Sequence, residues 1–210
     1  IKEMTTYDVL VVGGGTSGMM AAISAAEHGA KVAVIEKNSS LGRKLLVTGG
    51  GRCNVTNNRD KEEIIAHIPG NGRFLYSAFY QYDNYDIMDF FRSNGVTLKE
   101  EDHGRMFPIT DKSRTILEAL IGIMDRLEVD IYTEAPVETL LFDEGKVTGV
   151  QLQDGRNLNS TCMIVSTGGK AMPRTGSTGD GYKWAKKAGH TITPLYPTES
   201  PILSDEPFIK

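Results

Sequence analysis

Residues 7–36 read YDVLVVGGGTSGMMAAISAAEHGAKVAVIE, and this stretch decides the fold. It opens with the apolar run 9–12, which is typical of a parallel strand in a sheet covered by helices on both faces. The alanine-rich residues 16–28 have good helix propensity, and residues 31–35 form a second apolar run. The order of strand, glycine turn, helix and strand predicts a βαβ unit of the doubly wound α/β class.

Three glycines of the turn fall at G-x-G-x-x-G spacing. Gly13 permits a tight turn, Gly15 lets the backbone approach a pyrophosphate, and Gly18 lets the helix pack closely on the strand. The helix N-terminus favours an anion through its unpaired N–H groups and its macrodipole. Glu36 ends the second strand and can accept hydrogen bonds from both hydroxyls of an adenosine ribose. The glycine spacing alone would be a weak indication. Together with the flanking strands, the helix and the terminal glutamate, it predicts a dinucleotide site.

The composition points to a small-molecule ligand. The 210 residues carry a formal net charge of -4, which gives no electrostatic reason to expect nucleic acid or an anionic membrane as a partner. Of the two cysteines, Cys53 and Cys162, the second lies in a predicted strand, so we expect a reducing cytoplasm and no disulfide framework. No run approaches the roughly 18 apolar residues of a membrane span.

A long loop, KNSSLGRKLLVTGGGRCNVTNN, follows Glu36. A nicotinamide-type domain would pass quickly into its next helix, so this loop favours a longer cofactor. Lys37, Arg43 and Lys44 are placed to meet ribose or phosphate. The glycines at 49–51 let backbone amides approach a ligand closely. The alternative is a solvated basic loop with a flexible turn.

Two reactive side chains receive no catalytic role. The guanidinium of Arg52 could lower the pKa of the neighbouring Cys53 thiol, but we favour a small side chain packed against the cofactor. His103 stands beside three carboxylates, where a solvated turn is the better interpretation. The remaining histidines are scattered, and no metal-ligand spacing is present.

The middle of the chain is predicted to be mainly helical. Helices are expected over residues 59–67, 73–81 and 85–94, with Asn84 as the N-cap of the last and Gly95 as its stop. Aromatic residues recur near helical spacing here, and we expect core positions for Phe74, Tyr76, Phe79, Tyr80, Phe90 and Phe91.

Further elements follow in chain order. A hairpin is predicted over residues 96–108, then an amphipathic helix laid on a sheet over 113–127 and a third parallel strand over 129–132. A small antiparallel meander covering one side of the sheet is expected over residues 135–159.

A last core strand is predicted over residues 162–166. It runs into Thr167, Gly168 and Gly169, at the sheet edge where ligands sit in open α/β folds. The glycine-rich residues 176–181 then lead into a helix, 182–188, and suit either an anion or an ordinary helix cap.

Together the motifs resemble a known family. The blocks GGGTSG with Glu36, LGRKLLVTGGGRCNVTN, VSTGGKAMPRTGSTGDGYKWAKKAGH and LYPTESPI are similar to bacterial aminoacetone-oxidase-like or BaiN-like NAD(P)/FAD-dependent oxidoreductases. The resemblance covers nearly the whole chain, and GRKLLVTGGGRCN is its most specific part. The first and last blocks are shared more widely with glutathione-reductase-type and fumarate-reductase-type folds.

The resemblance implies a Rossmann-like FAD-binding domain of the glutathione-reductase type, with FAD in an extended form. It implies the glycine turn at the pyrophosphate, Glu36 on the ribose, the backbone of Val137 at the adenine and Asp180 near the ribityl side. The complete predicted cofactor-binding set is Gly13, Gly15, Thr16, Ser17, Gly18, Glu36, Lys37, Arg43, Lys44, Gly50, Gly51, Cys53, Asn54, Val137, Thr167, Gly168, Gly169 and Asp180.

Such relatives run to about twice this length, as is usual for two-domain enzymes. They insert a substrate-side domain near the segment after Leu195 and then return to the FAD domain. We therefore expect an N-terminal part of a longer protein, with an incomplete FAD-binding domain at 1–193 and the start of a second domain or linker at 194–210.

The resulting hypothesis is an FAD-dependent oxidoreductase that transfers a hydride through the flavin to or from a small organic substrate, with NAD(P)H as a candidate electron donor. One alternative is a non-catalytic module that binds a flavin or an adenine nucleotide. Another is an RNA-modifying flavoprotein, against which the acidic balance argues. The substrate, the catalytic side chains and the oligomeric state are not specified by the sequence.

Overall fold

The computed structural model describes residues 6–197 of the chain. Its larger sheet has the strand order β6-β2-β1-β9-β8-β7. The strands are β1 (Thr6–Val12), β2 (Val32–Ile35), β6 (Asp130–Tyr132), β7 (Val137–Asp143), β8 (Lys146–Leu152) and β9 (Asn157–Val165). The first four in spatial order run parallel, and β8 and β7 continue the sheet as an antiparallel meander. The predicted α/β class with a small meander is therefore confirmed.

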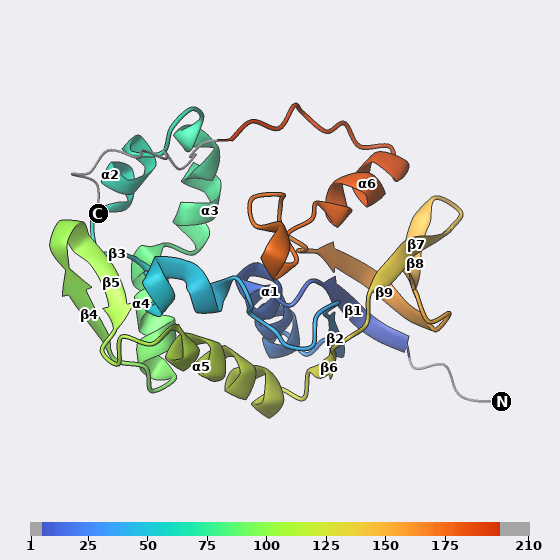
Figure 1. The fold of residues 1–210 in the computed structure, drawn as a ribbon, viewed down its shortest axis with the longest axis horizontal. Helices are drawn as coiled ribbons and strands as arrows, with labels where there is room; N and C mark the ends of the chain where they lie inside the picture. The colour runs from blue at the N-terminus through green and yellow to red at the C-terminus, as the bar shows by residue number, and fades with distance from the viewer. Residues whose placement is uncertain (1–5, 198–210) are drawn as a thin grey trace, which may run out of the picture.

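A second, smaller antiparallel sheet has the order β3-β5-β4. Its strands are β3 (Thr56–Asn57), β4 (Leu98–Glu101) and β5 (Arg105–Pro108). The helices are α1 (Thr16–Glu27), α2 (Lys61–Ala66), α3 (Tyr76–Gln81), α4 (Asn84–Ser93), α5 (Ser113–Arg126) and α6 (Asp180–Lys187). Short 3₁₀ turns are η1 (Leu45–Gly51), η2 (Gly72–Leu75), η3 (Asp102–Gly104) and η4 (Pro173–Thr175). In Figure 1 the large sheet and α6 lie at one end, the small sheet at the other, and α1 and η1 between them.

The parallel strands separate two apolar clusters because successive side chains of a strand point to opposite faces. Val11 packs on one face with Met19 of α1 and Leu120 of α5. Leu10 packs on the opposite face with Leu140 of the meander. Helices thus cover one face, while the meander's own side chains, with Trp184 of α6, cover the other.

Strand β9 differs from prediction in its burial and in its length. Its residues Cys162, Ile164 and Val165 are exposed, so the predicted core position of residues 162–166 is wrong. The pattern indicates two strands, 156–159 and 162–166, but the structure has one continuous strand. Asn159 pairs with Gly149 of β8 on one side and with Thr6 of β1 on the other, so the chain passes from antiparallel to parallel pairing without a break. Gly149 is required at this join because a Cβ there would lie 2.1 Å from the carbonyl oxygen of Leu158.

Helix α5 also corrects an expectation. Its periodicity predicts a helix laid on the sheet, yet it packs chiefly against α1 and η1. The reason is that α1 already covers this face of β1 and β2, so the apolar stripe of α5 reaches the same core from beside α1.

The start of α4 is displaced by one residue from the prediction. Asp83, not Asn84, caps the helix, in a reciprocal capping box with Asp86. The side chain of Asn84 is instead buried. Its Nδ2 donates to the backbone carbonyl oxygens of Asn57 and Arg59, at 2.7 and 2.9 Å. Asn84 therefore ties α4 to the small sheet, while Gly95, with φ of +81°, ends the helix as predicted.

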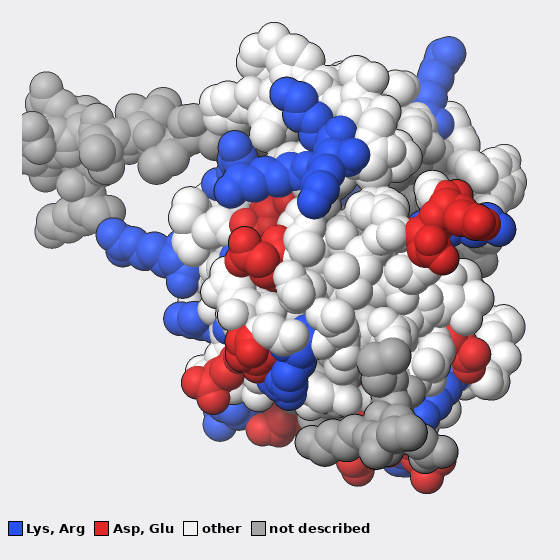
Figure 2. All heavy atoms as spheres, turned by 90° about the vertical axis from the view of Figure 1, so that its right-hand side faces the viewer, with Lys and Arg blue, Asp and Glu red and all other residues white. Residues whose placement is uncertain are grey.

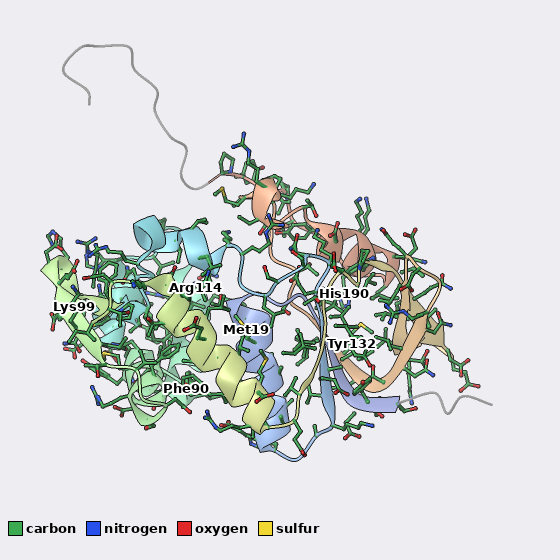
Figure 3. The ribbon with its side chains drawn as sticks, turned by 60° about the horizontal axis from the view of Figure 1, so that its bottom comes forward. Met19, Phe90, Lys99, Arg114, Tyr132 and His190 are labelled. Atoms are coloured by element: carbon green, nitrogen blue, oxygen red, sulfur yellow. The ribbon has the colours of Figure 1, made fainter. Side chains whose placement is uncertain are left out.

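The aromatic residues divide between core and surface. Phe91 is buried, and Phe90, at the lower left in Figure 3, packs against the same cluster. Phe74, Tyr76 and Tyr80, however, are 80%, 37% and 71% exposed, so their predicted core positions are wrong. All three belong to the short η2 and α3, and no residue of α3 is buried. Among residues 6–197 no helix is long and apolar enough to span a membrane.

Candidate dinucleotide-binding site

A cavity of about 1100 Å³ lies at the carboxyl ends of β1, β2 and β9. It is lined by the β1–α1 turn, the segment after β2, the end of β9 and the start of α6. The carboxyl edge of parallel strands is where open α/β sheets bind ligands, because the chain splays into loops there.

The β1–α1 turn has the geometry that its three glycines predict. Gly13 adopts φ of +110° and donates its N–H to the carbonyl oxygen of Ile35 at 2.8 Å. A Cβ on Gly18 would lie only 1.8 Å from the carbonyl oxygen of Gly13, so this position must be glycine for α1 to pack. A Cβ on Gly15 would meet nothing within 4 Å and would project from the cavity wall.

The N-terminus of α1 presents a partial positive charge at this wall. The N-cap residue of α1 is Gly15, which has no side chain to cap the helix. The first turn of α1 carries no acidic residue. The first N–H groups of a helix have no intrahelical acceptor, and together with the macrodipole they favour an anion. The wall can therefore hold the negative charge of a phosphate.

Glu36 is 8% exposed and holds the cavity wall together. Its Oε2 accepts from the N–H of Gly14, and its Oε1 accepts from the N–H of Asn38, both at 2.8 Å. Oε1 also accepts from the side-chain nitrogen of Asn38 at 2.5 Å. Because each carboxylate oxygen can accept more than one hydrogen bond, Glu36 keeps acceptor capacity for a ligand hydroxyl at Oε2.

Basic residues border the same part of the cavity. Lys37 Nζ lies 2.7 Å from Asp180 Oδ2 and 2.7 Å from the hydroxyl oxygen of Thr178. Burial tends to raise the pKa of Asp180, but its hydrogen bonds from Lys37 and Thr178 outweigh that effect and hold the pKa below its ordinary value. Arg43 donates to the side-chain oxygen of Asn38 at 2.8 Å.

The end of β9 is fastened to both neighbouring turns. The hydroxyl of Ser166 donates to the carbonyl oxygens of Val12 and Gly13, each at 3.1 Å. The hydroxyl oxygen of Thr167 accepts from the N–H of Gly181 in α6 at 3.2 Å. Sequence reasoning missed Ser166, although its place after an apolar strand was a usable signal.

The loop of η1 forms a further wall. Thr48, Cys53 and Asn54 line the cavity. Burial raises the pKa of the Cys53 thiol to about 11, which disfavours the activated thiolate that a neighbouring Arg52 would promote. Cys53 has φ of +64°, an uncommon conformation for a residue other than glycine.

Arg52 joins a charge network on the small sheet. Its guanidinium lies 2.9 Å from Glu101 and 3.3 Å from Asp111, and it covers the ring of Phe107 at 4.2 Å. Lys99, at the outer end of the small sheet in Figure 3, lies 2.6 Å from Asp111. The network fastens the η1 loop to the β4–β5 hairpin.

Most predicted cofactor-binding residues line the cavity. Those at its wall are Gly13, Gly15, Thr16, Ser17, Glu36, Lys37, Arg43, Lys44, Cys53, Asn54, Val137, Thr167, Gly168 and Asp180. The structure brings these segments together, and their contacts with a cofactor stay a prediction.

Four predicted residues do not line the cavity, which are Gly18, Gly50, Gly51 and Gly169. Gly18 lies behind the wall, where it permits helix packing. Gly50 and Gly51 adopt φ of +65° and +85° within η1, so they shape the loop without lining the cavity. Gly169 faces the hydroxyl of Tyr182, to which an added Cβ would come within 3.1 Å.

A further part of the cavity is apolar and was not predicted. Three helices and the segment before α4 form this wall. Its residues are Met20 of α1, Tyr82 before α4, Ile87 and Phe90 of α4, and Leu120 of α5. Helical periodicity marks such residues only as core, and the crossing of three helices decides which of them face a cavity. Within residues 6–197 no cluster of His, Cys, Asp or Glu has an arrangement that could hold a metal ion.

The parallel sheet, the glycine turn packed on β1 and the acidic residue ending β2 define a Rossmann-type dinucleotide-binding domain. Residues 7–198 match the HI0933-like protein Rossmann domain, and the chain belongs to this family. The predicted family resemblance is thereby confirmed.

Several proteins are similar to this chain. It is 35% identical to a 3-dehydro-bile acid delta(4,6)-reductase of Clostridium scindens over 190 residues, covering 89% of the chain and 45% of that relative. It is 28% identical to the ribosomal RNA dihydrouridine synthase of Escherichia coli, covering 99% of the chain and 50% of that relative. The structure of Mycobacterium smegmatis Sdh1 in complex with UQ1 has a TM-score of 0.67 at 20% identity, covering 88% of the chain and 38% of its own length. The chain thus spans about half the length of the curated relatives it matches.

Proposed function

We propose that this chain binds FAD in the cavity at the carboxyl edge of the large sheet and belongs to a flavin-dependent oxidoreductase. One observation carries the proposal: the Gly13–Gly15 turn, Glu36 and the Thr167–Gly168 end of β9 line a single cavity. The reductase name of the Clostridium scindens relative supports the oxidoreductase class.

The proposed assignment follows the charge of each part of the cofactor. The pyrophosphate lies at Gly15, Thr16 and Ser17, where the N-terminus of α1 meets the cavity. The adenosine ribose lies at Glu36, and the adenine against the backbone of Val137. This orientation directs the flavin toward the end of β9 and the η1 loop, the remaining walls of the same cavity.

The chemistry divides between cofactor and protein. Bound FAD would supply hydride acceptance and donation, which needs no nucleophile from the protein. The protein's part is to position the cofactor through the glycine turn and Glu36 and to exclude water with the apolar wall that contains Ile87, Phe90 and Leu120. An apolar wall also favours an uncharged organic substrate, because burying an unpaired charge is costly.

We further propose NAD(P)H as the electron donor, because the chain resembles NAD(P)/FAD-dependent oxidoreductases. The acidic residue Glu36 would repel a 2′-phosphate at the cavity proposed for FAD. A phosphorylated nicotinamide nucleotide would therefore have to reach the flavin from outside the adenosine end.

The test uses the full-length protein. Purification should yield a yellow protein whose flavin spectrum is bleached by NADH or NADPH without oxygen and restored by air. A colourless protein that takes up no added FAD contradicts the proposal. A coloured protein that no nicotinamide nucleotide or chemical reductant can cycle indicates a non-catalytic flavin-binding module instead.

A second candidate is a flavoprotein that acts on RNA. Two observations favour it: the name of the Escherichia coli relative, and exposed Lys183, Lys186 and Lys187 on α6. Figure 2 shows basic side chains gathered at the top of the face that carries α6. The net charge of -4 argues the other way.

Binding measurements separate the two candidates. Specific RNA binding should weaken steeply with salt, and replacing all three α6 lysines with glutamine should reduce both the affinity and its salt dependence. If the protein binds no RNA at low salt but its flavin is still reduced and reoxidised, the small organic substrate is favoured.

A further inference from the structure

We propose that Lys37, Thr178 and Asp180 form a clasp across the cavity, which must open for the nucleotide to enter or leave. The inference rests on the proposed function, since it concerns exchange of the nucleotide in the same cavity. It adds a role for these residues in retaining the cofactor in addition to any direct contact.

The clasp joins two segments that are far apart in sequence. Lys37 follows β2, and Asp180 begins α6, 143 residues later. Both line the cavity, so the 2.7 Å contact between Nζ and Oδ2 connects two of its walls. Thr178 strengthens the connection, because its hydroxyl oxygen accepts from Lys37 at 2.7 Å and lies 3.0 Å from Asp180 Oδ2.

Backbone packing beside the ion pair supports the same connection independently. Gly176 has φ of +102°, and a Cβ added there would lie 2.7 Å from the side-chain nitrogen of Asn38 and 3.3 Å from Cε of Lys37. The side-chain nitrogen of Asn38 also lies 3.5 Å from the carbonyl oxygen of Thr175. The loop before α6 therefore rests directly on the segment after β2.

The clasp lies beside the proposed ribose end of the site, whereas the family resemblance implies Asp180 near the ribityl side. Asn38, which contacts the loop before α6, also donates from its N–H to Oε1 of Glu36. A nucleotide whose ribose is bound to Glu36 would thus lie beside the point where the two walls meet. Opening this contact would expose the ribose without disturbing the glycine turn.

The contacts have the strength expected of a gate. The side chains of Lys37 and Asp180 are 32% and 29% exposed, so the pair is partly screened by solvent. Ion pairs of this kind are weak enough to open on thermal fluctuation, whereas a deeply buried pair would hold the walls permanently. Their charge also makes opening sensitive to salt.

The test measures both rate constants for FAD exchange in the full-length protein, using Lys37→Ala, Asp180→Asn and the double variant. A gate predicts that association and dissociation both accelerate, by about threefold to tenfold, with little change in affinity. The double variant should be no faster than either single one, because both remove the same contact. Lys186→Ala, an exposed α6 lysine outside the cavity wall, is the matched control and should behave as wild type.

Other outcomes overturn the clasp. If dissociation alone accelerates, and the two substitutions add, then Lys37 and Asp180 contact the nucleotide directly and do not gate it. Unchanged rates in both single variants also contradict the proposal. A wild-type protein that binds no FAD contradicts the proposed function and is distinguishable from either result.

A second measurement needs no nucleotide. In the full-length protein without added FAD, Lys37→Ala should speed amide hydrogen exchange in residues 175–181 severalfold, because the loop loses its fastening. Exchange that is unchanged there relative to Lys186→Ala would show that the loop does not depend on the clasp.

Discussion

At the scale of single residues, two glycines of one turn have different physical requirements. Gly18 needs the absence of a Cβ for protein packing, since the added atom would lie 1.8 Å from the carbonyl oxygen of Gly13. Gly15 has φ of -78° and ψ of -177°, which alanine adopts readily, and a Cβ there would meet no protein atom within 4 Å. Its requirement, under the proposed function, comes from the ligand.

We expect Gly18→Ala to lower the free energy of unfolding by about 3 kcal/mol, the upper range for overpacking in a rigid core. Gly15→Ala should change it by less than about 0.5 kcal/mol. FAD affinity should instead fall about tenfold in Gly15→Ala, or about 1.4 kcal/mol. Denaturant unfolding and FAD titration of both variants check this, and equal losses of stability would contradict the division.

Glu36 provides a second prediction for the cavity. Replacing it with alanine removes a buried acceptor, and we expect FAD retention to weaken by about 1–3 kcal/mol. The matched control is Glu62→Ala on the surface of α2. Fluorescence titration with FAD measures the difference, and unchanged retention would remove Glu36 from the proposed site.

The Cys53 thiol allows a prediction on pH. Its pKa is about 11 in the folded chain against an ordinary value of 9.0, because burial disfavours the thiolate. Between these pH values the unfolded chain loses the proton while the folded chain keeps it, so stability falls as pH rises above 9. The fall levels off above 11 and totals about 2–3 kcal/mol at most.

The measurement compares unfolding of wild type and Cys53→Ala between pH 7 and about 11. Their difference in stability should shrink with rising pH, since only wild type carries this titration. An alkylating reagent at pH 8 should modify the exposed Cys162 and spare Cys53. Rapid modification of Cys53 would contradict its burial.

At the scale of elements, the small sheet positions one wall of the cavity. The N–H of Val55 donates to the carbonyl oxygen of Met106 at 2.8 Å, and Arg52 pairs with Glu101 and Asp111. These contacts fix the chain on both sides of Cys53. The β4–β5 hairpin is thus part of the cavity's support, although none of its residues lines the cavity.

Arg52→Gln should therefore loosen the η1 loop while leaving the large sheet intact. We expect faster amide exchange in residues 48–54 and weaker FAD binding, with exchange in β1 and β9 unchanged. Arg92→Gln is the control, because Arg92 forms an exposed ion pair with Asp89 within α4 and is not part of this network. If exchange in the loop is unaffected, the network is not what holds it.

Prediction from sequence succeeded for elements with strong local signals. The strand–turn–helix–strand of residues 7–36 and the β4–β5 hairpin form as predicted. Prediction failed where contacts with distant segments determine the structure. β9 is one strand because β8 and β1 pair with it at the same residue. Phe74 and Tyr80 are exposed although their spacing is helical, because burial depends on what packs against η2 and α3 and not on the spacing.

At the scale of the whole molecule, the large sheet unites two apolar clusters. Leu10 and Leu120 belong to different clusters, and both are almost completely buried. Since β1 contributes side chains to each face, the clusters share their central strands and should unfold together.

We expect Leu10→Ala and Leu120→Ala each to lower the free energy of unfolding by about 2–5 kcal/mol. Both should shift one and the same thermal transition, observed by circular dichroism in the full-length protein. Two transitions, each affected by only one substitution, would show that the faces are independent folding units.

The sequence by itself determined the class of fold and the chemistry of one site. Glycine spacing, apolar runs and a terminal acid specify a βαβ turn because each depends on backbone geometry within about 30 neighbouring residues. These local signals located the segments of the cavity wall on either side of Glu36.

Only the tertiary structure decided which distant residues meet. The pairing of Lys37 with Asp180, the fastening of Arg52 to the hairpin and the apolar wall around Phe90 each join segments from different parts of the chain. Such contacts depend on how helices cross and strands align, which the residues on one segment cannot specify alone. The glycine turn could be predicted from local sequence, whereas the cavity and its clasp depend on tertiary packing.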